Sequence, residues 1–351
     1  MRTQRHTNSL FVAGLLIFAG SGFADSVATP RKDADKPAVV TSGKKILWED
    51  PFATGARNLI YGSGGQAHQP ASTVFDFSEE QMSGSTPKFK VIDSAGTSWK
   101  VKLGVEAKPE TVATRFVWAA GYATDEDYFL PDIEIRNLPA HLHRGERYRL
   151  PGGKFKDARL ERDISSEKTA GIWRWKDSSF VGTREWNGLR VLMGLINNWD
   201  VKDVNNSVYT RKSDGDAGPD ARYIYVISDL GATFGPNRLD LGHKRNKGDL
   251  KHYARTHFVH KTRPDTVSFS APAPPSLAIM ILNPFTYIGR RRLTWIGHDI
   301  PRQDARWMGT ILGRLTPGQI RDAFRAGGYS REDVEAFAAI VEKRIAALNE
   351  L

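Results

Sequence analysis

Four polar residues in two short segments have the types and the spacing for chemistry on a phosphate group. Asp200, Lys202 and Asn205 stand at offsets of zero, two and five, directly after an apolar stretch with helical spacing. Asp229 follows residues 223–228, whose alternation of side chains predicts a strand. The sequence therefore places a polar loop after a helix and an aspartate after a strand.

Phosphoryl transfer requires a protein to position a hydroxyl, hold a divalent metal and neutralise charge on the phosphates. Asp200 is expected to accept or orient the hydroxyl proton, and Lys202 to balance the γ-phosphate. Asn205 and Asp229 offer the hard oxygen ligands that Mg²⁺ or Mn²⁺ prefers. Taken alone, this loop is also typical of a solvated turn after a helix, so the hypothesis depends on partners elsewhere in the chain.

Two further candidates come from the first half of the chain. Residues 89–92 and 99–103 alternate and flank a turn at residues 93–96, which predicts a β-hairpin. Lys102 lies on its second strand and is expected to reach the nucleotide phosphates. A helix is predicted from Pro109 to about residue 120, and Glu110 is either its helix-start acid or the ion-pair partner of Lys102. Glu106 is an alternative partner.

A glycine-rich stretch lies at residues 58–65, with Gly62, Gly64 and Gly65 in four positions. Backbone amides in such a turn can approach phosphates, so Gly64 is a candidate nucleotide contact. The spacing differs from Gly-x-Gly-x-x-Gly, and a plain turn is the alternative interpretation.

The length and the N-terminus indicate the organisation of the chain. At 351 residues the chain exceeds the roughly 250–300 residues of a single core, so two lobes are expected. Residues 1–24 read as a secretory signal peptide, with basic residues before a short apolar run and small residues after it. Residues 25–47 read as a flexible tether, residues 48–171 as a β-rich lobe and residues 172–351 as a mainly helical lobe. The apolar run is too short for a membrane span, and an exported, periplasmic or extracellular bacterial protein is expected.

Composition excludes some chemistry and suggests one kind of partner. The chain contains no cysteine, so disulfides, thiolate metal sites and a cysteine nucleophile are excluded. Its net charge of +10 can favour an anionic partner, although no specific nucleic-acid motif accompanies the charge. Basic residues gather at residues 290–292 and 244–255.

The remaining patterns predict the order of the elements. Strands are expected at residues 128–137 and within 147–160, a helix at 185–198, loops up to residue 263 and a rigid proline-rich linker at 272–275. Helices are expected at residues 304–315, 317–326 and 331–348. The fold class is therefore α+β.

The set of Lys102, Glu110, Asp200, Asn205 and Asp229, in this order, resembles the atypical protein-kinase-like superfamily, especially the HipA-type, secretory-pathway and CotH-type kinases. The resemblance implies a two-lobed protein-kinase-like fold with a β-rich N-lobe and a mainly helical C-lobe. It also implies ATP as co-substrate, Mg²⁺ or Mn²⁺ as cofactor, and transfer of a phosphoryl or nucleotidyl group to an unknown protein, glycan or small-molecule acceptor.

Three features depart from the pattern of conventional protein kinases. Asn198 and Trp199 stand where His-Arg usually precedes the loop aspartate, Leu230 replaces the usual phenylalanine, and no Ala-Pro-Glu follows. An exported pseudokinase or binding protein that uses a basic surface is the alternative hypothesis. A hydrolase with Asp200 and Asp229 as an acid/base pair is a third.

Overall fold

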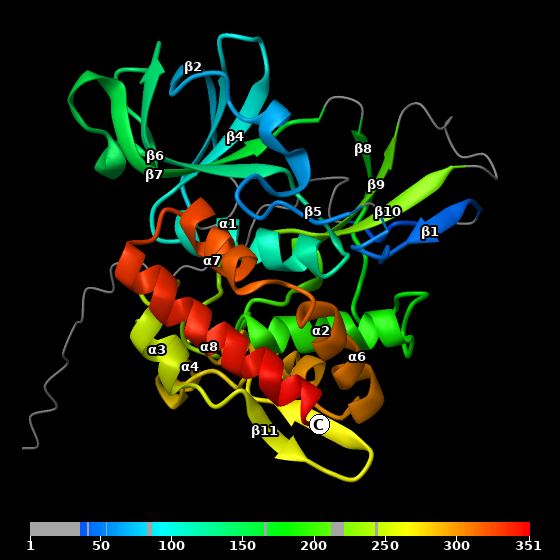
Figure 1. Ribbon diagram of the computed structural model, residues 1–351. Helices are drawn as coiled ribbons and strands as arrows, with labels where there is room; N and C mark the ends of the chain where they lie inside the picture. The colour runs from blue at the N-terminus through cyan, green and yellow to red at the C-terminus, as the bar shows by residue number, and fades with distance from the viewer. Residues whose placement is uncertain are drawn as a thin grey trace, which may run out of the picture.

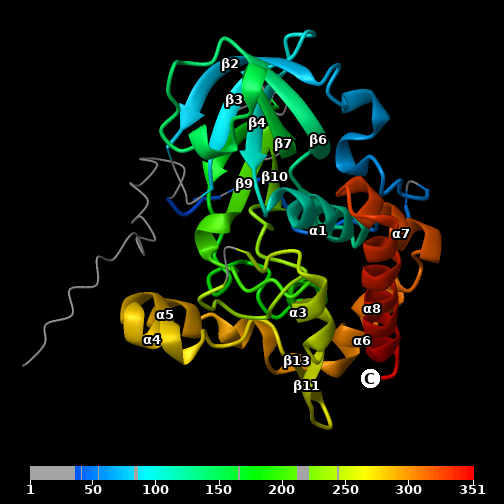
Figure 2. The same ribbon diagram turned by 90° about the vertical axis from the view of Figure 1, so that its left-hand side faces the viewer.

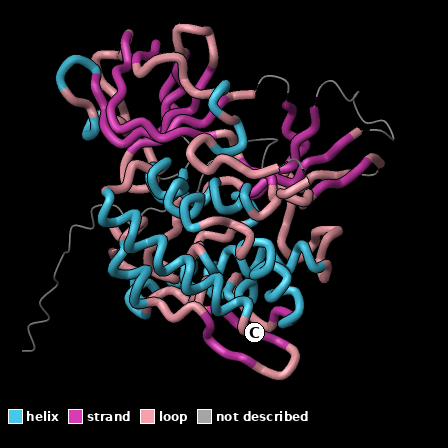
Figure 3. Tube along the Cα trace, in the orientation of Figure 1, coloured by secondary structure: helices cyan, strands magenta, loops and turns pink. Residues whose placement is uncertain are grey.

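The structure, a computed structural model, describes residues 36–40, 42–53, 55–82, 86–164, 167–211, 221–242 and 245–351. Strands occupy the upper part of the molecule and helices most of the lower part (Figures 1 and 3). This confirms the predicted α+β class with a β-rich N-lobe and a mainly helical C-lobe. The predicted signal peptide, residues 1–24, lies outside the described residues. None of the described helices is long and apolar enough to cross a membrane.

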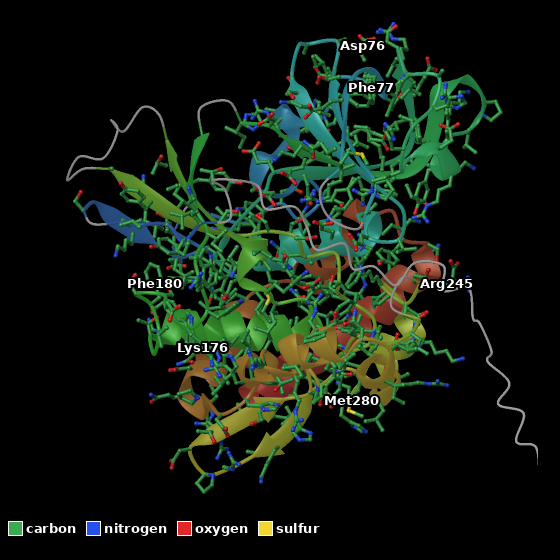
Figure 4. The ribbon with its side chains drawn as sticks, turned by 180° about the vertical axis from the view of Figure 1, so that it is seen from behind. Asp76, Phe77, Lys176, Phe180, Arg245 and Met280 are labelled. Atoms are coloured by element: carbon green, nitrogen blue, oxygen red, sulfur yellow. The ribbon has the colours of Figure 1, made fainter. Side chains whose placement is uncertain are left out.

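A closed barrel forms the N-lobe. Its strands, in their order around the barrel, are β2 (Val74–Gln81), β3 (Lys88–Ile92), β4 (Ser98–Leu103), β7 (Lys154–Arg162) and β6 (Asp127–Arg136). Phe89, Val91 and Val101 alternate into its core and are fully buried. Lys102, one residue after Val101, therefore points out of the barrel. Asp76 and Phe77 mark the barrel in Figure 4.

The predicted hairpin is confirmed as β3 and β4, which pair antiparallel with Lys88 opposite Lys102. The side chain of Asp93 closes its turn. It accepts hydrogen bonds from the backbone N–H groups of Ala95 and Thr97 and from Nε1 of Trp99, each at 2.9 Å. Gly96 takes the positive φ of 79° that this turn requires. The register of the two lysine-bearing strands is thus set locally.

A second sheet joins the two lobes. Its order is β1 (Lys44–Ile46), β10 (Arg222–Ile227), β9 (Asn206–Arg211) and β8 (Glu167–Gly171), with β5 (Ala123–Thr124) also pairing with β10. The prediction of a tether up to residue 47 is wrong at its end, because β1 pairs parallel with β10. This segment is ordered by backbone pairing to a neighbouring strand. Such pairing does not need a periodic pattern of apolar residues, so the sequence gives no signal for it.

The main helices of the core agree with their predicted positions. α1 (Ala107–Ala119) follows the hairpin, and α2 (Arg184–Leu195) starts at Thr183, whose side chain accepts from the N–H of Trp186 at 3.2 Å. The C-lobe ends with α6 (Arg302–Leu312), α7 (Pro317–Ala326) and α8 (Arg331–Asn349). One continuous hydrophobic cluster connects α1 with these helices, so the lobes share a core.

Several C-lobe elements differ from the expectations. The region expected to be loops contains α3 (Leu250–Arg255) and β11 (Val259–Thr262), which forms a small sheet with β12 (Thr266–Phe269) and β13 (Ile300–Pro301). After the proline-rich segment come two unpredicted short helices, α4 (Leu277–Leu282) and α5 (Pro284–Arg291). In the N-lobe, the expected strand over 147–160 begins only at Lys154; single helical turns occupy Glu146–Tyr148 and Pro151–Gly153.

A buried charge network connects α1 with strands β6 and β7. The Asp127 carboxylate accepts from Nη1 of Arg115 at 2.7 Å, from Nε of Arg159 at 2.6 Å and from Oγ1 of Thr114 at 2.9 Å. The side chains of both arginines are 2% exposed and that of Asp127 is fully buried. The Asp127 carboxylate therefore bridges two buried guanidinium groups, and Arg159 also pairs with Glu161 at 3.0 Å.

We expect Asp127→Ala to lower the free energy of unfolding by about 3–5 kcal/mol, because it removes the carboxylate that balances buried Arg115 and one of the carboxylates around Arg159. Urea denaturation followed by tryptophan fluorescence measures this loss. Asp76→Ala is the matched control, since its ion pair with Arg136 is exposed; its loss should stay below about 1 kcal/mol. Equal losses in the two variants would contradict the argument.

Candidate active site

Lys102 is the centre of a buried group of charges where the barrel meets α1. Its Nζ donates to Oε2 of Glu110 at 2.6 Å and to Oδ1 of Asp229 at 2.8 Å. Oε2 of Glu106 lies 3.4 Å from the same nitrogen. The pairing of Lys102 with Glu110 is present as predicted, and the alternative partner Glu106 lies in the same group. Strand, helix and the segment after β10 thus converge on one cation.

The charges of this group fix its protonation. Burial alone would lower the pKa of Lys102, but the carboxylates of Asp229, Glu110 and Glu106 raise it well above its usual value. Lys102, with help from Lys88, holds the pKa of Asp229 well below its ordinary range. Burial raises the pKa of Glu110. Lys102 and Asp229 therefore form an ion pair at neutral pH.

Glu106 connects this group to Lys247, which was not among the predicted site residues. Its carboxylate forms an ion pair with Lys247 and accepts from Oγ1 of Thr86 at 3.0 Å. Burial would raise the pKa of Glu106, but Lys102 and Lys247 together lower it. Lys247 lies in the basic region noted at residues 244–255, and that charge was its sole sequence signal.

The loop after α2 is held by buried polar side chains. Asn197 adopts a positive φ of 53°; its Oδ1 accepts from Nη1 of Arg344 on α8 at 2.8 Å, and its Nδ2 donates to the carbonyl of Gly235 at 2.8 Å. Oδ1 of Asn198 accepts from the N–H of Asp200 at 3.0 Å. Asn198, which stands where conventional protein kinases carry histidine, thus positions Asp200.

Asn205 connects the loop to the segment that carries Asp229. Its Nδ2 donates to the carbonyl of Asp200 at 2.6 Å, and its own carbonyl accepts from the N–H of Ser228 at 3.0 Å. Asp229 has a positive φ of 50°, a strained conformation for a non-glycine residue that is typical of functional sites. Gly231 is required here, because a Cβ at this position would lie 2.9 Å from Cβ of Glu106. The structure therefore brings Asp200, Asn205 and Asp229 into one hydrogen-bonded unit.

The Asp200 carboxylate has two basic neighbours. Arg290, on the unpredicted helix α5, binds both carboxylate oxygens, with Nη2 at 3.1 Å from Oδ2. Nζ of Lys202 lies 3.5 Å from Oδ1 of Asp200, and the side chain of Lys202 is 43% exposed. Burial would raise the pKa of Asp200, but Arg290 and then Lys202 lower it. Arg290 belongs to the basic run at residues 290–292, whose proximity to the loop no local pattern indicates.

Trp199 lies between the two charged groups. Nζ of Lys247 is 5.6 Å from its ring centroid, and the guanidinium carbon of Arg290 is 5.4 Å from it. Cations at such distances are attracted to the indole face. Trp199, which stands where conventional protein kinases carry arginine, thus connects the Lys247–Glu106 pair with the Arg290–Asp200 pair.

The structure does not bring Gly64 into this site. Gly64 ends a short helical turn, Gly62–Gly64, that precedes β2, and a Cβ there would meet Oη of Tyr128 and the carboxylate of Glu126. The segment that approaches Lys102 is instead the connection from β2 to β3, where Thr86 binds Glu106; its residues 83–85 lie outside the described ones. The spacing of glycines indicates the backbone conformation of a segment, but it does not indicate where that segment lies in the fold.

The donor set can be tested against a divalent metal. The side-chain nitrogen of Asn205 donates to the carbonyl of Asp200, so Oδ1 of Asn205 is left for a metal. The side chain of Asp229 is 45% exposed although it is bound to Lys102. These hard oxygen atoms fit Mg²⁺ or Mn²⁺. Carboxylate oxygens of Glu106, Glu110 and Asp229 also lie within 4.8 Å of one another, but Lys102 already balances that group. Asn205 and Asp229 are therefore the better pair of ligands.

A cavity of about 360 Å³ is lined by Lys100, Asp125, Glu161 and Tyr209 among others. Lys100 precedes Lys102 by two residues on β4. Lys100 and Glu161 form an ion pair at 2.7 Å. Burial, followed by the charge of Glu161, raises the pKa of Asp125 to about 7. Oγ of Ser228 donates to Asp125 at 3.2 Å, so Asp125 is hydrogen-bonded to the residue that precedes Asp229.

Asp125 should make stability depend on pH between about 4 and 7, because an unfolded aspartate titrates near about 3.9. The folded chain binds more protons in this window, so stability falls as pH rises through it. In Asp125→Asn this contribution is absent, and the thermal midpoint of the variant should rise relative to the wild type across the window. Asp132→Asn, at an exposed strand position, corrects for the loss of one formal charge. A constant difference between Asp125→Asn and the wild type would refute the assignment.

No family model and no curated protein matches the sequence. Among solved structures, a Helicobacter pylori proinflammatory kinase, CtkA, is similar at a TM-score of 0.43 and 12% identity, covering 79% of this chain and 96% of that chain. Golgi casein kinase is similar at a TM-score of 0.35 and 10% identity, covering 79% of this chain and 72% of that chain. The structure of the Golgi casein kinase with Mn/ADP bound is similar at a TM-score of 0.34 and 10% identity, with the same coverage of both chains. In this chain, Lys102 on β4, Glu110 on α1 and Asp229 after β10 meet in one group of ion pairs.

Proposed function

We propose that this chain is an exported, atypical kinase-like enzyme that transfers a phosphoryl group, or a nucleotidyl group, from ATP to a protein, glycan or small-molecule acceptor. The observation that carries the proposal is the position of Lys102, bound at once to Glu110 at 2.6 Å and to Asp229 at 2.8 Å. A lysine held by a helix glutamate, beside an aspartate suited to a metal, is the arrangement that positions nucleotide phosphates in kinases.

Each residue has a role in phosphoryl transfer. An acceptor hydroxyl oxygen forms a bond to the γ-phosphorus while the bond from that phosphorus to the bridging oxygen breaks, and ADP leaves. Asp200 orients the hydroxyl and receives its proton, and Lys202 offsets charge on the moving group. Mg²⁺ or Mn²⁺, when bound, neutralises the phosphate oxygens, and Asn205 and Asp229 would hold it.

Lys88 adds a second cation to the phosphate site. It lies directly opposite Lys102 on the neighbouring strand, so both side chains project from the same face of the barrel. Like charges in this register destabilise a sheet, and Lys102, followed by burial, lowers the pKa of Lys88. A polyphosphate between the two lysines would remove this repulsion, which supports ATP and not an uncharged donor.

An exported pseudokinase that binds an anionic partner is the second candidate. It is favoured by the ion pair between Arg290 and both oxygens of Asp200, which occupies the carboxylate that chemistry would need. Export itself rests on residues 1–24, and their sequence pattern supports it. The two candidates differ in turnover and not in the binding of nucleotide.

The first test uses the chain from residue 25, which retains every described residue. We expect Mg²⁺ with saturating ATP to raise its thermal midpoint by several degrees, because a ligand that binds the folded state stabilises it. Asp229→Asn should abolish this rise, whereas Asp200→Asn should keep it but lose turnover, measured as ADP release with candidate acceptors. Turnover retained in both variants would exclude the proposed mechanism. Binding without turnover in the wild type would favour the pseudokinase.

The second test addresses Lys88. We expect Lys88→Met to weaken ATP binding roughly tenfold to a hundredfold, since a charged hydrogen bond to phosphate contributes about 1.5–3 kcal/mol. AMP binding should change much less, because AMP lacks the outer phosphates. Lys90→Met is the matched control: Lys90 is on the same strand face but pairs with Asp163 at 3.1 Å. Equal effects of the two substitutions, measured by calorimetric titration, would refute a specific role for Lys88.

A further inference from the structure

The helical hairpin of α4 and α5 exposes an unusual amount of apolar side chain. Of the fourteen large hydrophobic residues exposed in the described part of the chain, six belong to this hairpin. Their exposed fractions are Leu277 68%, Met280 42%, Ile281 76%, Leu282 55%, Phe285 87% and Ile288 47%. Large contiguous apolar patches on soluble proteins usually mark an interaction site. These six residues are called the apolar face below.

The inner side of the hairpin is firmly packed, so the apolar face does not result from loose structure. Ile279 and Tyr287 pack with Trp199, Ala232 and Leu239 in a small hydrophobic cluster. Oδ1 of Asn283 accepts from the N–H of Thr286 at 3.0 Å and caps α5. Both helices therefore have an ordered inner surface and direct their remaining apolar residues outward.

Basic residues border the apolar face. Phe285, Ile288 and Arg292 recur at spacings of three and four residues and so share one side of α5 and its end. Arg291 and Arg292 are both exposed. No aspartate or glutamate occurs between Asp265 and Asp299, so the sequence around the hairpin carries positive charge alone. Apolar side chains beside arginines suit a surface that is apolar inside and anionic outside.

The shape favours a fluid surface over a protein groove. α4 and α5 project from the side of the C-lobe in Figure 2, and Met280 on α4 lies on the C-lobe in Figure 4, well away from the barrel. A projecting apolar face with adjacent arginines can enter the boundary between the headgroups and acyl chains of a bilayer. None of the described helices could cross the bilayer, so such binding would be peripheral.

We propose that the apolar face of the α4–α5 hairpin, together with Arg291 and Arg292, binds this protein to the surface of an anionic lipid bilayer. Affinity in this mode grows with the apolar area that enters the interface and with attraction to anionic headgroups. The proposal does not depend on the proposed enzymatic function, because the binding requires neither nucleotide nor metal.

The test is co-sedimentation of the chain from residue 25 with vesicles. Vesicles of equal parts phosphatidylglycerol and phosphatidylcholine should bind the protein, and vesicles of phosphatidylcholine alone should bind it much less. High salt should weaken the binding, because the Debye length shortens. We expect Ile281→Ser with Phe285→Ser, and separately Arg291→Glu with Arg292→Glu, each to reduce the bound fraction at limiting lipid by roughly tenfold or more.

Matched controls separate the hairpin from general surface effects. Val181→Ser with Leu150→Ser removes exposed apolar side chains elsewhere, and Arg331→Glu reverses an exposed charge at the start of α8. Both controls should bind vesicles as the wild type does. Retained binding in the hairpin variants would overturn the proposal. A second result would also overturn the proposal: the wild type is a dimer in light scattering, does not bind vesicles, and becomes monomeric in Phe285→Ser. The apolar face would then bind a second copy of the chain.

Discussion

The shared ion pairs of Lys102 are the interaction on which the site depends. One ammonium group holds a carboxylate from α1, another from the segment after β10 and a third from the start of the helix. Removing one partner from such a group leaves a buried, unbalanced charge, which typically costs about 3–5 kcal/mol. A folded protein is stable by only about 5–15 kcal/mol. Strand, helix and loop are therefore held in mutual position by electrostatics as much as by packing.

The candidate site contains two charged groups. Lys102 and its carboxylates lie on the barrel side, and Asp200 with Arg290 lies on the C-lobe side. Trp199 and Lys247 connect them through aromatic and ionic contacts. Because Asn205 bonds to the backbone of both Asp200 and Ser228, a displacement of the loop also displaces Asp229. Asp200 and Asp229, to which we assign the proton-accepting and metal-binding roles, are thus mechanically coupled.

Local patterns predicted the elements that carry the candidate site residues, because each residue lies in or beside an element with a clear period. Lys102 follows the alternation of β4, Glu110 opens a helix, and Asp200 follows the apolar stripe of α2. Arg290 was missed because it meets Asp200 across 90 positions, and Lys247 because it meets Glu106 across 141. Ion pairs between distant segments leave no periodic trace. Helices α4 and α5 were missed for a different physical reason: their apolar residues point outward, whereas helix patterns assume that apolar residues face a core.

The contacts of Arg344 determine when during synthesis the site can form. This buried residue of the last helix donates through Nη1 to the carbonyl of Leu195 and to Oδ1 of Asn197, each within 2.8 Å, and through Nη2 to the carbonyl of Tyr253 at 3.1 Å. The loop that carries Asp200 thus receives its support from a residue that lies 147 positions after Asn197 in the chain. Domains begin to fold while the chain is still on the ribosome. A nascent chain can complete the barrel early, but the loop that carries Asp200 stays unsupported until α8 has emerged.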